Sequence, residues 1–241
     1  MSRGEGKTWD EIWQRWRRFY EGRPPEQAVI DLAARLKAEG RHRVHDLGCG
    51  PGRHLLYLAA EGFETSGSDF SPAAVETCRR RLREADLSAS VTLADMTDLP
   101  AEDGSLDAVI AWDLVYHGTL ETMRRTVEGV RRKLRPGGYL LLTFNSVDNV
   151  SCLRAREEVA RGKAEELEPN TFVVPDDPAD KALPHHYTTE QEIREQIMEG
   201  FRIVSLTAVP SPATAYGADP RRGVKFHVLA VREDSQRVGK G

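Results

Sequence analysis

The chain has 241 residues, 39% hydrophobic and 30% charged, with a formal net charge of −4, and this length suffices for one large domain around a buried sheet. The slightly negative net charge argues against nucleic acid as a partner. The apolar runs are far shorter than the ~20 residues of a membrane helix, and the polar N-terminal residues lack the apolar core of a signal peptide. Three cysteines without a CxxC spacing predict a reducing compartment and argue against disulfides or structural zinc. We therefore expect a cytoplasmic protein that binds no membrane and no metal, as a monomer or homodimer.

The N-terminal segment, residues 8–20, is rich in aromatic side chains at helical spacing. Three of the four tryptophans lie in it, and its large apolar residues are Trp9, Ile12, Trp13, Trp16, Phe19 and Tyr20. Two interpretations stay open, a helix packed on the domain or a lid whose aromatic face closes over bound ligands. Pro24 and Pro25 then introduce a second helix, which carries an apolar stripe over residues 28–36 and ends at Gly40.

A glycine turn follows the first predicted strand, residues 43–47. Gly48, Gly50 and Gly52 leave room for a sharp bend and a close ligand, and Asp46 precedes them. A dinucleotide site reads G-x-G-x-x-G, whereas this loop reads G-x-G-x-G behind a carboxylate that would repel a pyrophosphate. The helix after the loop favours a ligand carboxylate at its N-terminus. A ligand with an amine and a carboxylate suits both features, which describes the methionine end of S-adenosylmethionine better than NAD.

Strands and helices alternate after this loop. Strands are predicted at 64–69, 90–95, 106–113 and 139–144, with helices from Ser71-Pro72 to about residue 85 and over 120–134. Such alternation predicts a parallel sheet with helices on both faces. The strands' carboxyl ends then share one edge, where ligands bind, and the acids Asp46, Asp69, Asp95 and Asp113 would meet there.

Residues 46–54 resemble the first motif of class I S-adenosylmethionine-dependent methyltransferases. The Gly-Arg-His ending and the leucine-rich helix are similar to the tellurite-resistance (TehB-like) and small-molecule branch. The resemblance implies an α/β, Rossmann-like sheet of seven mostly parallel strands with the last strand antiparallel, plus helical or loop lid elements. It implies S-adenosylmethionine as cofactor and S-adenosylhomocysteine as product.

Five segments are predicted from these patterns. Residues 1–22 form the lid candidate and residues 23–145 the cofactor-binding core. Residues 146–188 form an insertion that is expected to be helical over about 153–167 and is proline-rich after that. The length of this insertion is typical of functional lids or disordered loops. Residues 189–233 supply a short helix over 189–198 and two strands, 201–209 and 224–232, that complete the sheet, and 234–241 form a tail.

The cofactor-binding candidates follow the strand ends. Asp69 is expected to bind the ribose hydroxyls. The alternative role for Asp69, a helix cap, suits Ser71 better. The resemblance assigns adenine binding to Asp95 and Met96, and the alternative for Asp95 is a turn at the end of its strand. Arg53 either meets the cofactor carboxylate or is exposed, and Cys49 is a small packing residue. The full set is Asp46, Gly48, Cys49, Gly50, Gly52, Arg53, Asp69, Phe70, Asp95, Met96 and Trp112.

The acceptor side is less defined by the sequence. The catalytic candidates are Asp113, His117 and His185, and the substrate-binding candidates are Trp9, Trp13, Tyr20, Tyr116, His186 and Tyr187. Adjacent histidines rarely face one ion, so a metal site is disfavoured against a pocket lining or a structural loop.

The predicted function is methyl transfer to a small-molecule nitrogen, oxygen, sulfur or heavier chalcogen nucleophile in a closed pocket. Alignment and exclusion of water would supply most of the rate, and a hydroxyl or ammonium acceptor would also need a base. The alternatives are a methyltransferase acting on RNA or protein, a NAD-binding Rossmann oxidoreductase, and a binding module that lacks activity.

Overall fold

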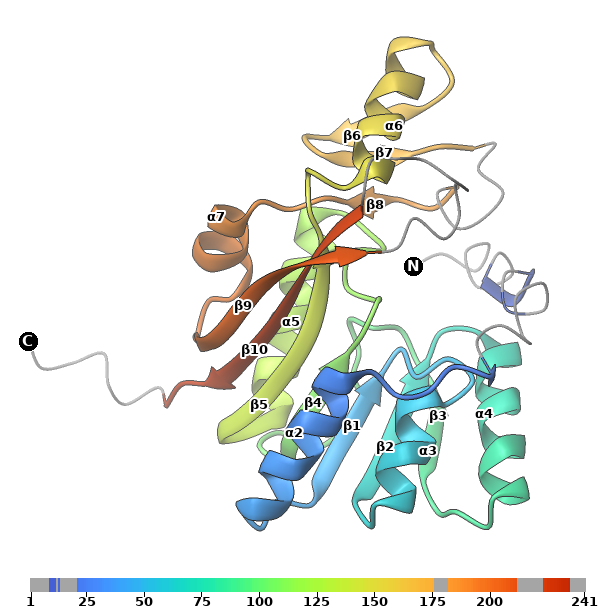
Figure 1. The fold of residues 1–241 in the computed structure, drawn as a ribbon, viewed down its shortest axis with the longest axis vertical. Coiled ribbons are helices and arrows are strands. Elements are labelled where there is room, and N and C mark those ends of the chain that lie inside the picture. Colours follow the sequence, from blue (N-terminus) through green and yellow to red (C-terminus); the bar gives the residue numbers. More distant parts are fainter. Residues whose placement is uncertain (1–8, 12, 14–20, 176–181, 212–222, 235–241) are drawn as a thin grey trace, which may run out of the picture.

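The computed structural model describes residues 9–11, 13, 21–175, 182–211 and 223–234 (Figure 1). Its centre is a seven-stranded sheet in the order β3-β2-β1-β4-β5-β10-β9. Strands β1 to β5 run parallel, and β10 runs antiparallel between β5 and β9. The expected Rossmann-like sheet with an antiparallel last strand is therefore confirmed. The bounds are β1 Arg43–Leu47, β2 Glu64–Asp69, β3 Ser90–Leu93, β4 Leu106–Ala111, β5 Leu134–Asn145, β9 Phe201–Ser211 and β10 Gly223–Arg232.

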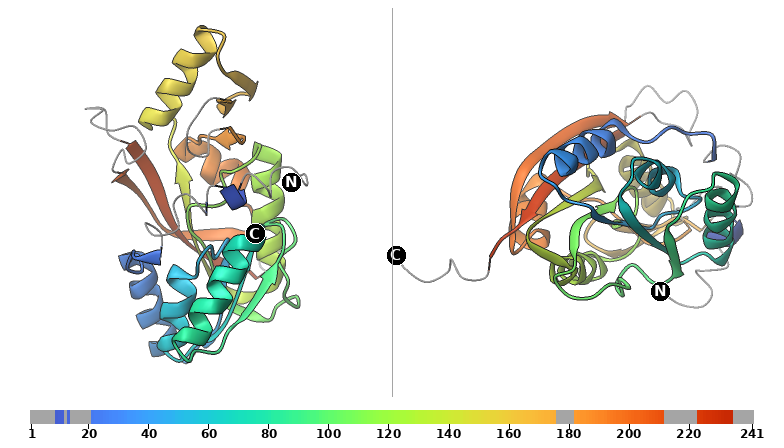
Figure 2. Two further views of the ribbon diagram at one scale, coloured as in Figure 1. Left: turned by 90° about the vertical axis from the view of Figure 1, so that its right-hand side faces the viewer. Right: turned by 90° about the horizontal axis from the view of Figure 1, so that it is seen from below.

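Helices cover both faces of this sheet (Figure 2). On one face lie α2 (Gln27–Ala38), α3 (Arg53–Ala60) and α4 (Pro72–Glu84), which bury Leu32, Leu58 and Val75 against β1 to β4. On the other face, α5 (Leu120–Lys133) buries Met123 and Val127 against β4, β5 and β10. Burial of these apolar side chains is the main source of the sheet's stability.

The helices begin at the edge of the sheet where the parallel strands end. Ser71 caps α4, since its side chain accepts the backbone N–H of Ala74, as predicted, and Thr119 caps α5 in the same way. Gly52, with φ 88°, turns the chain into α3. The N-termini of α3 and α4 therefore face the strand ends that carry the predicted cofactor residues.

Several element bounds differ from prediction. Strand β3 ends at Leu93 and β4 at Ala111, so Asp95 and Asp113 lie in the turns after their strands, and Asp113 has the left-handed φ of 53°. Strand β5 begins at Leu134, before Pro136, instead of after Gly138, because Leu134 pairs with Leu106 ahead of a shift in register.

The insertion folds as a small unit of its own rather than as a helix followed by loops (Figure 1). Helix α6 spans Val150–Ala160 and does not reach residue 167, because the chain turns at Gly162 with φ 70°. A second sheet follows, built from β6 (Glu165–Glu168), β7 (Thr171–Val173) and β8 (His185–His186). Sequence reasoning missed these strands because β6 is mostly glutamate and because β7 and β8 are only three and two residues long.

The remaining segments lie between the insertion and β9. The predicted short helix is a single turn, α7 (Glu190–Glu192), continued by π-helical residues 193–197. None of the helices described is long and apolar enough to cross a bilayer. The predictions for Ile12, Trp16, Phe19, Tyr20, the proline-rich residues 176–181 and the tail from 235 lie outside the described residues.

Candidate active site

The glycine loop after β1 is the first component of the site. Gly50 and Gly52 have φ values of 53° and 88°, which other residues rarely adopt. A Cβ atom on Gly48 would lie 2.7 Å from Leu114 Cδ1, and one on Gly50 would lie 2.8 Å from Trp13 Cη2. The loop therefore needs glycine for its bend and for the close approach of two other segments.

Asp46 lies buried beneath this loop, 2% exposed. Burial raises the pKa of its carboxyl to about 7, against the lowering effect of Arg53, and the backbone N–H of Leu55 donates to it. Its Oδ2 is a buried acceptor without a hydrogen-bond partner among the described residues. Such an atom costs free energy unless a ligand supplies a donor, so Asp46 fits a bound ammonium group.

Asp69 ends β2 and connects that strand to the loop. Its carboxylate accepts the backbone N–H of Gly50 and that of Ser71, each at 2.9 Å. Burial raises its pKa in spite of these hydrogen bonds. Asp69 therefore holds the loop in position, whatever else it contacts.

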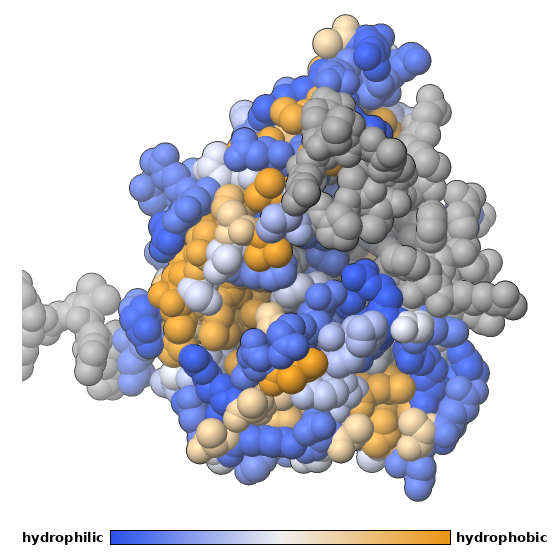
Figure 3. Space-filling model, viewed as in Figure 1, coloured by the Kyte–Doolittle hydropathy of each residue, from blue (hydrophilic) through white to orange (hydrophobic). Residues whose placement is uncertain are grey.

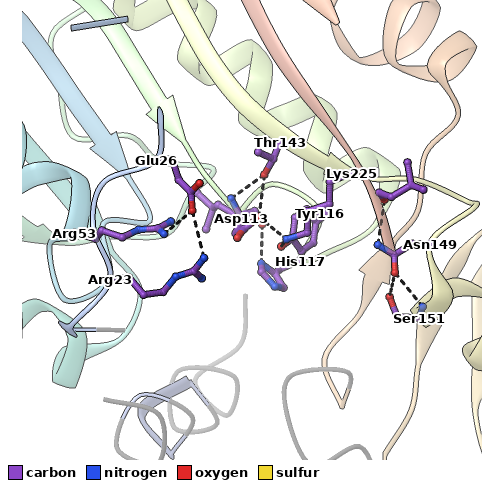
Figure 4. Close-up of polar contacts among 12 residues, drawn as sticks. Arg23, Glu26, Arg53, Asp113, Tyr116, His117, Thr143, Asn149, Ser151 and Lys225 are labelled. Atoms are coloured by element: carbon purple, nitrogen blue, oxygen red, sulfur yellow. Dashed lines mark hydrogen bonds and ion pairs between the residues drawn. The ribbon is translucent and has the colours of Figure 1, made fainter. Parts of the chain in front are cut away.

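Arg53, a candidate for the cofactor's carboxylate, has an acidic partner within the protein. Its guanidinium Nη1 lies 2.7 Å from Glu26 Oε1, at the start of α2, and Arg23 approaches the same oxygen at 3.5 Å (Figure 4). The carboxylate that Arg53 meets is thus one of the protein's own. Sequence reasoning missed Glu26 because it precedes the loop by a helix and a strand.

The remaining cofactor candidates lie around the same edge with differing surroundings. Asp95 accepts the backbone N–H and the hydroxyl of Thr97, at 2.9 and 2.8 Å, which matches the strand-end turn kept as its alternative. Met96 is buried and Phe70 partly buried. Cys49 is buried against Cys78, which agrees with a packing role. Trp112 packs edge-on to His227, with ring centroids 4.6 Å apart.

Asp113, after β4, is paired with a lysine that the sequence analysis did not single out. Lys225 Nζ, from β10, lies 2.6 Å from Asp113 Oδ1, and the Thr143 hydroxyl also donates to this oxygen (Figure 4). Although burial acts to raise it, the charge of Lys225 holds the pKa of Asp113 at about 2. A carboxylate with so low a pKa is a poor general base near neutral pH.

Three rings gather next to this ion pair. Tyr116 and His117 follow Asp113, and His185 comes from the insertion, with its ring 4.6 Å from that of His117 and edge-on to it. His117 Nδ1 lies 2.8 Å from the carbonyl of Leu114. Because a carbonyl only accepts, this Nδ1 carries the proton in neutral His117. The structure therefore brings the three catalytic candidates, Asp113, His117 and His185, into one cluster.

The N-terminal segment reaches both parts of the site. Trp9 packs edge-on against His117, with centroids 4.8 Å apart, while Trp13 contacts Gly50. Between them, Asp10 accepts from the Ser71 hydroxyl and from the backbone N–H of Ala73, at the N-terminus of α4. Trp9, Asp10 and Trp13 thus lie over the edge of the sheet between the glycine loop and the ring cluster.

His186 and Tyr187 lie elsewhere than expected. His186 is buried between the Thr171 hydroxyl, 2.6 Å from Nδ1, and Glu192, 3.0 Å from Nε2. Tyr187 is buried beside Phe172 in the core of the insertion. Both candidates for substrate binding therefore pack the insertion. His186 follows His185 in β8 and so points away from the ring cluster, because alternate residues of a strand point to opposite sides.

The sequence around this site is similar to that of known proteins. Residues 44–138 match a family profile described as a methyltransferase domain. The demethylmenaquinone methyltransferase of Clavibacter sepedonicus is 37% identical over 113 residues, 46% of this chain and 44% of that one. Over these residues the chain is similar to the class I S-adenosylmethionine-dependent methyltransferases. It spans less than half the length of the curated relatives that it matches.

Solved methyltransferase structures share the fold of this methyltransferase domain. Magnesium protoporphyrin IX methyltransferase (ChlM) from Synechocystis PCC 6803, with bound S-adenosylhomocysteine, aligns with a TM-score of 0.67 at 20% identity, over 95% of this chain and 100% of that one. TehB from Haemophilus influenzae aligns with a TM-score of 0.62 at 16% identity, over 91% and 66%. S-adenosylmethionine is the cofactor of this superfamily, and the buried Asp46 acceptor, the glycine loop and Asp69 fit it. In the ranges that the structure describes, no three His, Cys, Asp or Glu side chains are grouped to hold a metal.

Proposed function

We propose that the protein transfers the methyl group of S-adenosylmethionine to a small-molecule nucleophile at the edge formed by β1, β2, β4 and β10. The buried, unsatisfied Oδ2 of Asp46 carries this proposal, because an ammonium group supplies the donor that it lacks. Asp69 would accept the ribose hydroxyls, and Phe70, Asp95 and Met96 would lie beside the adenine. Bound there, the cofactor supplies an activated methyl group.

A small acceptor in a closed site is supported by the segments around the ring cluster. Trp9 and Trp13 contact the two halves of the site, and His185 reaches it from the insertion. Together, residues 1–22 and 146–188 would cover the core, 23–145, and exclude water, while 189–233 complete the sheet. Two similar proteins are named as methyltransferases of demethylmenaquinone and of magnesium protoporphyrin IX, and both of these acceptors are small molecules. Three buried free cysteines suit a reducing, cytoplasmic setting.

Titration calorimetry tests the cofactor. S-adenosylmethionine and S-adenosylhomocysteine are expected to bind with one site per chain, whereas NADH fluorescence should not change on addition of protein. Saturable binding of NADH, with no heat from S-adenosylmethionine, would support the oxidoreductase alternative instead. Formation of S-adenosylhomocysteine with RNA or protein but with no thiol, amine or phenol would move the acceptor to a macromolecule.

The raised pKa of Asp46 predicts how cofactor binding depends on pH. The cofactor's ammonium group needs the ionised carboxylate, and below a pKa of about 7 that form falls tenfold for each pH unit. Affinity for S-adenosylmethionine should therefore fall about fivefold from pH 7 to pH 6, fall further by about tenfold from pH 6 to pH 5, and level off above pH 8. Calorimetry across this range measures it.

Asp46→Asn is the matched control, since it removes the titrating group and keeps the shape. We expect weaker binding and a flatter pH profile, with any remaining slope due to Asp69, whose pKa is also raised. Equal slopes in the variant and the wild type would show that Asp46 does not meet the ammonium group.

A further inference from the structure

Lys225 is a charged side chain of the site to which no role has yet been given. It stands near the start of β10, where it pairs in register with Asn145 of β5. Its Nζ lies 2.6 Å from Asp113 Oδ1 and 3.3 Å from the hydroxyl oxygen of Tyr116 (Figure 4). The lysine side chain is 20% exposed and that of Asp113 is 37% exposed, so this ion pair forms the accessible part of an otherwise buried cluster.

The charges near Lys225 favour a negatively charged acceptor. Lys225 Nζ contacts Asp113 Oδ1, while Arg23 and Arg53 both contact Glu26. An ammonium acceptor would be repelled by the ammonium group of Lys225 and by the cofactor's sulfonium, whereas an anion would be attracted to both.

The same pairing removes Asp113 as a general base. Lys225 holds the pKa of Asp113 at about 2, although burial acts to raise it. An acceptor at this ion pair must therefore lose its proton readily without help from that carboxylate. Hydroxyl groups on conjugated rings and enols have this property.

Aromatic side chains lie beside this ion pair. The rings of Tyr116, His117 and His185 lie with centroids 4.5–5.9 Å apart, and Trp9 packs on His117. Aromatic side chains prefer such offset and edge-on contacts with further rings. Lys225 lies over the Tyr116 ring, 5.5 Å from its centroid, so its ammonium group is at the border of the aromatic surface.

We propose that Lys225 selects the acceptor by binding the ionised hydroxyl of a phenol or enol, whose oxygen then takes the methyl group. This inference rests on the proposed function. In the reaction, the hydroxyl releases its proton to solvent before transfer. The oxygen lone pair then forms the O–CH3 bond, and the S–CH3 bond breaks with its electron pair remaining on sulfur, which gives the methyl ether and neutral S-adenosylhomocysteine.

The visible absorption of 4-nitrophenolate, which the neutral phenol lacks, tests the inference without turnover. We would titrate 4-nitrophenol from low to high pH with the full chain saturated with S-adenosylhomocysteine. Binding is expected to lower the pKa of the probe by about one unit, as one close positive charge does. The groups around Lys225 that titrate or carry charge, and so must be included in the fit, are Asp113, Tyr116, His117, His227, Arg53 and Glu26.

Variants then separate the lysine charge from its surroundings. Lys225→Met should abolish the shift and weaken probe binding about tenfold, while Lys225→Arg should keep most of the shift. Lys133→Met, which removes a lysine paired with Asp103 away from the site, should behave as the wild type. Binding of 4-nitroaniline, which has the same ring and stays neutral, should change less than twofold in Lys225→Met.

The outcomes distinguish this inference from the proposed function. Failure of 4-nitrophenol to bind, an unshifted spectrum, or an equal shift in Lys225→Met would overturn the inference while S-adenosylhomocysteine still binds. Absence of S-adenosylhomocysteine binding by calorimetry would instead overturn the proposed function. Full recovery of the shift in the double variant Lys225→Met, Asp113→Asn would also overturn the inference, because it would assign the loss to the unpaired Asp113.

Discussion

Asp69→Ala is expected to weaken binding of S-adenosylmethionine by an order of magnitude or more. A hydrogen bond to a charged acceptor contributes about 1.5–3 kcal/mol, and each 1.4 kcal/mol is about tenfold in affinity. The substitution would remove the proposed contact with the ribose and also the two hydrogen bonds to Gly50 and Ser71, which hold the glycine loop. Calorimetry of the purified variant gives the change, and unchanged affinity would refute both roles.

The two roles of Asp69 can be separated with a second ligand. S-adenosylhomocysteine that lacks the ribose 2′-hydroxyl should bind about tenfold more weakly than the parent compound to the wild type. In Asp69→Ala the two ligands should bind alike, because the partner of that hydroxyl is gone, and a cycle of this kind isolates the pair. An equal penalty in both proteins would leave Asp69 only the task of positioning the loop.

Deletion of residues 1–20 is expected to reduce turnover by far more than it reduces stability. Trp9 and Trp13 contact the ring cluster and Gly50, so their loss would open the site to water and remove part of the acceptor's surroundings. Among the described contacts, loss of the Asp10 hydrogen bonds at the N-terminus of α4 should lower stability by about 0.5–2 kcal/mol, the range for a helix cap, while Ser71 still caps that helix. Turnover with an acceptor found by screening, and thermal unfolding, measure the two effects.

Two further variants test whether the loss of turnover is due to the N-terminal segment itself. Removal of residues 235–241 shortens the chain at the other end and should leave turnover unchanged. Trp9→Ala should reduce turnover with the cofactor affinity nearly intact, because Trp9 contacts His117 rather than the glycine loop. If the shortened chain is fully active, the segment serves only as packing.

The sequence by itself determined the fold class and the cofactor loop of this protein. Local features of the sequence depend only on neighbouring residues: the hydrophobic periods of strands and helices, the helix start at Ser71-Pro72, and the glycine bend after Asp46. Because the strands of a parallel sheet point the same way, their carboxyl ends then lie at one edge. Thus α2, β1, β2 and the antiparallel last strand agree with prediction. The insertion's small sheet was missed because its strands are two to four residues long and their pairing depends on Phe172 and Tyr187 packing under α6.

Only the tertiary structure decided the electrostatics of the site. Asp113 and Lys225 are 112 residues apart, and Arg53 and Glu26 are 27 apart, so neither pair leaves a local pattern in the chain. Their meeting follows from the insertion of β10 next to β5 and from the placement of α2 beside the glycine loop. Coulombic interactions depend on distance in space and on burial, which is why Asp113 changes from a candidate base into the partner of a lysine once the chain is folded.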